Sequence, residues 1–289
     1  MSSDYVWTPP GLDESELEQF LTIERGIPNA ANESIHRWLT RDMYGHEFMD
    51  VTVFLRFQTA ARQDLGFMNV GLTDVDQVLQ VLRGLDQTVR AYLVDFMLSE
   101  ITPSRLGTRP QRVEELQKIL GASGAGWQVG LRKERYGLVE VMPGGVVDIV
   151  EEAMSAADQA SSLLRAAWER AFGIDQSPSH AYYDAVRAVE VLSCPLISPK
   201  DANATLGKDI NVLRNAPDKW EFSMKGSKFV SPVEHVVSAM QLLWHSQSDR
   251  HGRADYEDVS ADEAQAAVLL SSTLVGWLSK SMLRRSEAN

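Results

Sequence analysis

Apolar residues recur at helical spacing along most of the chain, which predicts a mainly α-helical protein. The longest pattern covers residues 73–99, where Thr73 offers an N-cap oxygen and Pro103 follows the end. A second pattern covers residues 146–172. We expect each pattern to form one long helix.

The last third of the chain carries the clearest helix boundaries. Ser177-Pro178 begins a helical pattern with proline at the first position, and Pro195 is expected to end it. Residues 231–234 and 260–263 both have the Ser-x-x-Glu pattern of a capping box. These signals predict a C-terminal helical bundle.

Two segments depart from helical spacing. Residues 127–131 and 136–142 are separated by charged residues and predict a small β-hairpin near 127–142. Residues 46–65 alternate between apolar and polar positions near their centre, so a strand and a buried helix both fit them. The glycine-rich run 121–126 lacks the Lys-Ser/Thr of a phosphate loop and is expected to form a flexible turn.

These patterns divide the 289 residues into three parts. Residues 1–126 are expected to form a helical N-terminal domain of unknown role. Residues 127–173 are expected to form the β-hairpin and a long connecting helix. Residues 174–289 are expected to form the C-terminal helical domain.

Composition indicates a soluble, cytoplasmic protein. The single cysteine, Cys194, cannot build a disulfide framework and favours a reducing compartment. The chain begins without a signal-peptide pattern, and no stretch approaches 18 uninterrupted apolar residues. We therefore expect no membrane partner.

The net charge of −12 disfavours non-specific binding of nucleic acid, which depends on clusters of Lys and Arg. The charge is unevenly spread. Residues 174–289 hold 12 Lys/Arg and 15 Asp/Glu, a net of −3, whereas residues 1–173 hold 16 and 25, a net of −9. We therefore expect any RNA to bind the C-terminal domain and a protein partner to bind the acidic N-terminal half.

The densest set of ionisable side chains lies between the last two main helical patterns, in residues 245–258. A histidine such as His251 can accept or donate a proton near neutral pH, and the neighbouring Arg250 can stabilise charge on a phosphate. This chemistry needs neither a metal ion nor a cofactor, and His-x5-His from His245 to His251 matches no common zinc spacing. The alternative is an ordinary polar loop between two helices. Two other histidines, His36 and His46, have no partner nearby in the sequence.

Residues 175–280 resemble the abortive-infection C-terminal domains, which belong to the HEPN-like helical families. Four features carry the resemblance: the helical stretch 181–190 ending in Glu190, the stretch 205–208, the apolar helix ending in Trp244-His245, and residues 249–253 with the sequence Asp-Arg-His-Gly-Arg.

Active members of these families are metal-independent endoribonucleases with an Arg-x4–6-His motif that is duplicated across a homodimer. His251 matches the histidine of the motif, and His245 stands where the family has arginine. The resemblance implies a phage-defence or toxin-type protein, with His251 and His245 as acid–base groups and Arg250 as the phosphate clamp. It also implies that Glu190 orients a histidine, and Arg253 and Asp249 would contact the RNA. The alternative is a non-catalytic module for dimerisation or protein binding in a defence or regulatory system.

Overall fold

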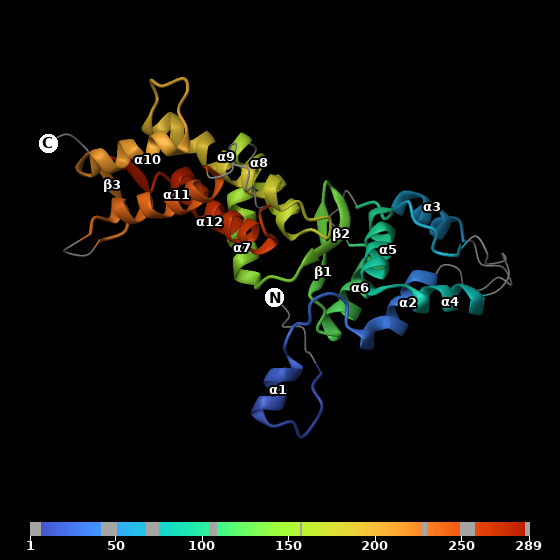
Figure 1. Cartoon of the computed structure of the whole chain (residues 1–289). Coiled ribbons are helices and arrows are strands. Elements are labelled where there is room, and N and C mark those ends of the chain that lie inside the picture. The colour runs from blue at the N-terminus through green and yellow to red at the C-terminus, as the bar shows by residue number, and fades with distance from the viewer. Residues whose placement is uncertain are drawn as a thin grey trace. The chain divides into compact units, whose positions relative to one another are not determined.

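The computed structural model describes residues 7–41, 51–67, 75–103, 109–156, 158–226, 230–248 and 258–286. These residues are mainly helical, which confirms the predicted fold class (Figure 1). The chain divides into two compact units, Met1–Val141 and Met142–Asn289. Among the described residues, no helix is long and apolar enough to cross a membrane.

The N-terminal unit consists of short helices and one hairpin. In chain order they are α1 (Glu14–Phe20), η1 (Asn29–Ala31), α2 (Asn32–Thr40), α3 (Thr52–Ala61), α4 (Val75–Gly84), α5 (Gln87–Ser99), α6 (Gln111–Ala122), β1 (Trp127–Arg132) and β2 (Arg135–Glu140). Helix α2 packs against α4 and α6, and α3 packs against α5. Their inward side chains, including Leu39, Phe54 and Leu116, are fully buried.

The predicted β-hairpin is confirmed, and it packs against α5 and α6. Asp95 on α5 holds it there, because its carboxylate accepts hydrogen bonds from Arg132 Nη2 at 2.6 Å and from the Leu138 amide at 2.7 Å. A Cβ atom at Gly137 would lie 2.8 Å from Arg132 Nε and 2.9 Å from Asp95 Oδ1, so a larger residue would have to displace this ion pair. The hairpin is therefore part of the N-terminal unit.

The C-terminal unit is a helical bundle with a two-stranded ribbon. Its elements are α7 (Gly144–Met154), α8 (Gln159–Phe172), α9 (Pro178–Ile197), α10 (Leu206–Asn215), η4 (Pro217–Lys219), β3 (Trp220–Phe222), α11 (Pro232–Ser248), α12 (Ala261–Ser279) and β4 (Leu283–Arg285). Helices α8, α9 and α12 pack against one another, α10 packs against α9 and α11, and β3 pairs with β4. Helices α7 and α8 belong to this compact unit, which begins at Met142.

Both predicted long helices were wrong in length, since each is two helices separated by a capped break. Asp86 accepts a hydrogen bond from the Thr88 amide at 2.8 Å and begins α5, so α4 ends at Gly84. In the same way Asp158 accepts from the Ser161 amide at 2.7 Å and begins α8. Such carboxylates satisfy amides that lack a partner in the first turn, and this allows a new helix direction without disturbing the apolar spacing.

Three other predictions from the sequence can be compared with the structure. Residues 46–65 contain helix α3, which resolves the choice between strand and helix for their central part. Pro195 does not end α9, which continues to Ile197, since a proline close to the helix end removes only one hydrogen bond. The capping box at Ser260 and Glu263 is confirmed, with both reciprocal hydrogen bonds present.

Candidate functional site

The predicted site residues fall into two groups. His245 lies in the last turn of α11 and is exposed, and Glu190 lies on α9 and is half-buried. Asp249, Arg250, His251 and Arg253 lie outside the described residues, as does His46.

Glu190 is held at the beginning of α10. Its Oε1 accepts a hydrogen bond from the Leu206 amide at 2.9 Å, and its Oε2 lies 3.8 Å from Arg187 Nε. A carboxylate in this place satisfies a free amide and interacts favourably with the positive end of the helix dipole. Thr205 also caps this helix, accepting from the Lys208 amide. Glu190 therefore fixes the position of the first turn of α10.

The end of α11 reaches the same turn of α10. Gly207 lies so close to Trp244 that a Cβ atom would be 2.8 Å from Trp244 Nε1. One residue earlier, the Leu243 carbonyl accepts a hydrogen bond at 2.7 Å from the hydroxyl of Tyr182 on α9. We call this meeting point of α9, α10 and α11 the α10 junction, defined by Glu190, Leu206, Gly207 and Trp244.

Glu190 and His245 are both predicted site residues. The α10 junction connects Glu190 with Trp244, which precedes His245, through contacts that were not predicted from the sequence. Glu190 accepts a hydrogen bond from the Leu206 amide in the first turn of α10, and Trp244, the neighbour of His245, contacts Gly207 in the same turn. Sequence reasoning missed the contact of Gly207 with Trp244 and the hydrogen bond of Tyr182. The only available signal was the glycine that follows the capping residue Thr205.

Gly207→Ala tests whether the α10 junction fixes the end of α11. The added methyl group must displace the indole of Trp244 or the first turn of α10. Overpacking of this kind typically destabilises a domain by about 1–3 kcal/mol. We expect urea unfolding to show this loss and Trp244 fluorescence to change in the folded state. Gly145→Ala is the matched control, because a Cβ there meets no atom within 4 Å.

A buried carboxylate, Asp209, lies two residues after Gly207 on α10. Asp209 is fully buried and accepts hydrogen bonds from the hydroxyls of Ser193 at 2.8 Å and Ser198 at 2.6 Å. Burial, and then the charge of Asp209, raise the pKa of the Cys194 thiol to about 12. Because the thiolate is the nucleophilic form, Cys194 is unsuited to nucleophilic catalysis at neutral pH.

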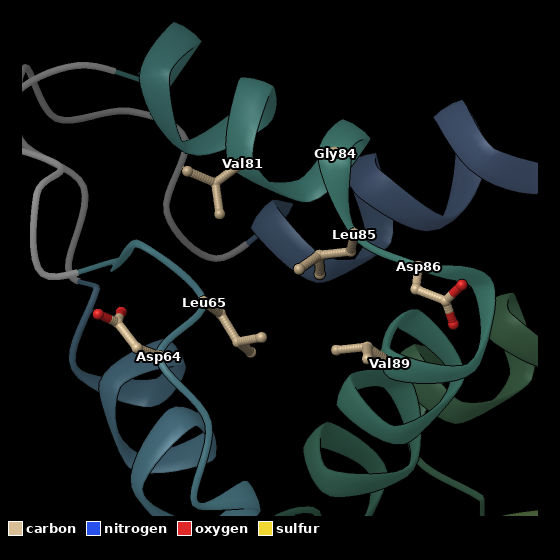
Figure 2. A pocket seen from close by; sticks show the side chains of 7 residues that line it. All are labelled: Asp64, Leu65, Val81, Gly84, Leu85, Asp86 and Val89. Carbon is tan, nitrogen blue, oxygen red and sulfur yellow. The ribbon is translucent and has the colours of Figure 1, made fainter.

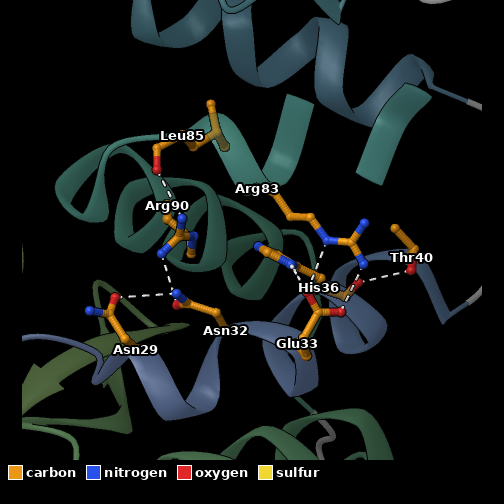
Figure 3. A network of polar contacts seen from close by, with 8 residues as sticks. All are labelled: Asn29, Asn32, Glu33, His36, Thr40, Arg83, Leu85 and Arg90. Carbon is orange, nitrogen blue, oxygen red and sulfur yellow. Dashed lines mark hydrogen bonds and ion pairs between the residues drawn. The ribbon is translucent and has the colours of Figure 1, made fainter. Parts of the chain in front are cut away.

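The N-terminal unit contains a separate polar cluster between α2, α4 and α5 (Figure 3). Glu33 accepts two hydrogen bonds from Arg83, at 2.9 and 3.1 Å, and this contact lowers the pKa of Glu33. Arg90, which is almost fully buried, donates to Asn32 at 2.8 Å and to the Leu85 carbonyl at 2.9 Å. These bonds join the break between α4 and α5 to α2, which is a structural role.

His36 is the unusual member of this cluster. It is buried, and neither ring nitrogen has a hydrogen-bond partner among the described residues. Its Nδ1 lies 3.7 Å from Glu33 Oε1, three residues earlier in the sequence, which corrects the expectation that His36 has no partner nearby. Burial, and then the charge of Arg90, lower the pKa of His36 below its ordinary value of 6.5.

The lowered pKa of His36 predicts a loss of stability in weak acid. The unfolded chain takes up a proton near pH 6.5, whereas the folded chain resists it, so acid favours unfolding. The contribution is complete above pH 6.5 and is lost as the pH falls toward the folded pKa. We expect urea midpoints measured from pH 7.5 to 5 to decrease, and to decrease less in His36→Phe. An equal slope in both proteins would contradict the assignment.

A shallow hollow of about 420 Å³ lies near the same break (Figure 2). Leu65, Val81, Leu85 and Val89 turn aliphatic side chains toward it, and Asp64 and Asp86 lie at its edges. Asp86 is already engaged in capping α5, and its hydrogen bond from Thr88 lowers its pKa. The lining offers neither a nucleophile nor a cation, so the hollow lacks groups for acid–base or phosphate chemistry.

A search for metal-ligand clusters and the comparisons with known proteins give no further site among the described residues. Within the part of the chain that the structure describes, no three His, Cys, Asp or Glu side chains are grouped to hold a metal ion. No family model matches the sequence, and no curated protein or solved structure shows a significant similarity to it. The HEPN-like resemblance therefore stays a prediction.

Proposed function

We propose that the C-terminal unit is a HEPN-like module of a phage-defence or toxin-type protein that cleaves RNA without a metal ion. The observation that supports this most is the α10 junction. It holds Glu190 and the last part of α11 against the first turn of α10. His245 therefore has a defined position, from which the chain continues to His251.

The reaction needs only groups that this segment can supply. The ribose 2′-hydroxyl attacks the adjacent phosphate and the 5′-oxygen leaves, which gives a 2′,3′-cyclic phosphate and a 5′-hydroxyl. His251 and His245 would remove one proton and return another, and Arg250 would stabilise the charge on the phosphate. Arg253 and Asp249 would contact neighbouring nucleotides. Glu190 would act as a positioning residue through α10.

A homodimer would bring two such segments together. Tyr183 and Leu242 are 50% and 67% exposed, and they follow and precede the hydrogen-bonded pair Tyr182 and Leu243. The two apolar side chains therefore belong to adjacent parts of α9 and α11, close to the turn that carries His245. Exposed apolar side chains of this kind favour association with a second copy.

The experiment is cleavage of a defined oligonucleotide by the purified full-length protein in the presence of EDTA. The substrate contains one ribonucleotide within a DNA strand, and the control carries a 2′-O-methyl group at that position. Cleavage of the first alone, with a 2′,3′-cyclic phosphate product, is expected. Cleavage of both substrates, or cleavage only after Mg²⁺ is added, would contradict the proposed chemistry. Total RNA is assayed in parallel in case the single ribonucleotide is a poor substrate.

A second candidate function is a non-catalytic module that dimerises or binds protein. The observation that favours it is the engagement of both Glu190 oxygens, one by α10 and one by Arg187, which gives Glu190 a structural role without RNA. Light scattering that shows a dimer, together with no cleavage of any RNA, would favour this candidate. Leu242→Glu should then convert the dimer to a monomer.

A further inference from the structure

Helix α1 is stabilised by its own caps and not by burial. Asp13 accepts a hydrogen bond from the Glu16 amide at 2.8 Å, and the Glu16 carboxylate accepts one from the Asp13 amide at 3.0 Å. No residue of α1 is buried, and Figure 1 shows the helix standing clear of the other helices of its unit. Because short helices are marginal in water without packing, α1 would gain stability from a surface that buries its apolar side chains.

The apolar side chains form one continuous stripe. Leu17, Phe20 and Leu21 occupy positions i, i+3 and i+4, which lie on the same side of a helix, and they are 36%, 43% and 52% exposed. Ile23, beyond the end of the helix, is a further exposed apolar side chain, at 53%. Single exposed apolar residues are ordinary, but a row at helical spacing is typical of a helix that docks into a groove.

Acidic side chains border the stripe on both sides. Residues 13–24 contain five acidic residues and no Lys or Arg. Glu16 and Glu18 are one position before and after Leu17, which places them about 100° to either side of it. A complementary surface must therefore be apolar at its centre and basic at its edges.

The base of this segment is fixed to the N-terminal unit. The Glu24 amide donates to the Gly124 carbonyl at 2.9 Å, and the Gly126 amide donates to the Gly26 carbonyl at 3.0 Å. Gly126 approaches so closely that a Cβ atom would lie 2.7 Å from the Glu24 carbonyl oxygen. The unit therefore presents α1 from a firm attachment, which reduces the entropy lost on docking.

We propose that residues 13–24, the α1 arm, dock into an apolar groove edged by Lys and Arg on another protein. Phe20 and Leu17 are the anchors, and Glu16 and Glu18 pair with the basic edge. In a second copy of this chain, the hollow at the break between α4 and α5 is a poor fit for the arm, since it is edged by Asp64 and Asp86. RNA is a poor fit as well, because the acidic border repels phosphate. This interaction does not depend on cleavage of RNA by the C-terminal unit.

The test uses benzoylphenylalanine in place of Phe20 in the full chain, expressed in cells that naturally make the protein and activated by light. The crosslinked peptides are sequenced, and the captured protein is purified for binding assays. Benzoylphenylalanine in place of Leu131, an exposed apolar residue of the hairpin, is the control. We expect the Phe20 position alone to capture a protein, at an apolar surface surrounded by Lys and Arg.

Binding to the purified partner must then follow the charge and the apolar stripe. Phe20→Ala should weaken the affinity about tenfold or more, as expected for an anchor residue. Glu16→Gln with Glu18→Gln should weaken it several-fold and reduce its dependence on salt. Both variants should unfold at the wild-type urea concentration, because these side chains are exposed and glutamine at position 16 keeps an oxygen that can accept the Asp13 amide of the capping box. Crosslinks only within this chain or to a second copy, no capture at all, or binding that is indifferent to the glutamates would overturn the proposal.

Discussion

His251→Ala is expected to abolish cleavage of RNA. A general acid or base typically accelerates proton transfer by about 10²- to 10⁴-fold, so the single-turnover rate should fall by that range. The measurement is cleavage of the single-ribonucleotide strand in EDTA, with protein in excess of substrate. An unchanged rate would remove His251 from the mechanism, and with it the proposed family assignment of residues 249–253.

His245 supplies a second test. The resembling nucleases have arginine at this position, but in the proposed chemistry His245 exchanges a proton with the RNA, and a guanidinium, which always carries its charge, cannot do so. His245→Arg and His245→Ala should therefore both lower the cleavage rate. His245 is exposed at the end of α11, and urea unfolding of both variants checks that the rates compare folded proteins. His235→Arg, on an exposed position of the same helix, is the matched control and should leave the rate unchanged.

The helical character of the chain could be predicted because it depends on spacing that is local in sequence. The capping box at Ser260 was found for the same reason, since both partners lie within four residues. The breaks at Asp86 and Asp158 were missed because a capping aspartate within an apolar pattern resembles an exposed helical residue. Local spacing therefore indicates helix, but not where one helix stops and the next begins.

The candidate site shows the same difference between features that are local in the sequence and features that are not. Glu190 and His245 could be singled out from the sequence because carboxylates and imidazoles can take part in proton transfer, and their catalytic role stays a prediction. Their placement could not be predicted, since it depends on Gly207 and Trp244, which are 37 positions apart and carry no reactive group. The same is true of the hairpin, whose strands were predicted but whose attachment to α5 was not.

That attachment predicts the largest loss of stability in the N-terminal unit. Asp95→Ala removes the carboxylate that pairs with Arg132 and accepts the Leu138 amide, and both charged side chains are largely buried, at 15% and 14% exposure. Breaking a buried pair by removing one partner typically costs about 3–5 kcal/mol, because the other charge is left without compensation. We expect urea unfolding, followed through Trp38, which is buried in this unit, to show this loss.

Two further variants separate the charge from the hydrogen bond. Asp95→Asn keeps an oxygen for the Leu138 amide but loses the charge, so its loss should be smaller than that of Asp95→Ala. Asp95→Leu combined with Arg132→Met removes both charges, and it should recover part of the stability because no buried charge then lacks a partner. If Asp95→Ala and the double variant are equally unstable, the cost comes from the lost hydrogen bond to Leu138 and not from Arg132.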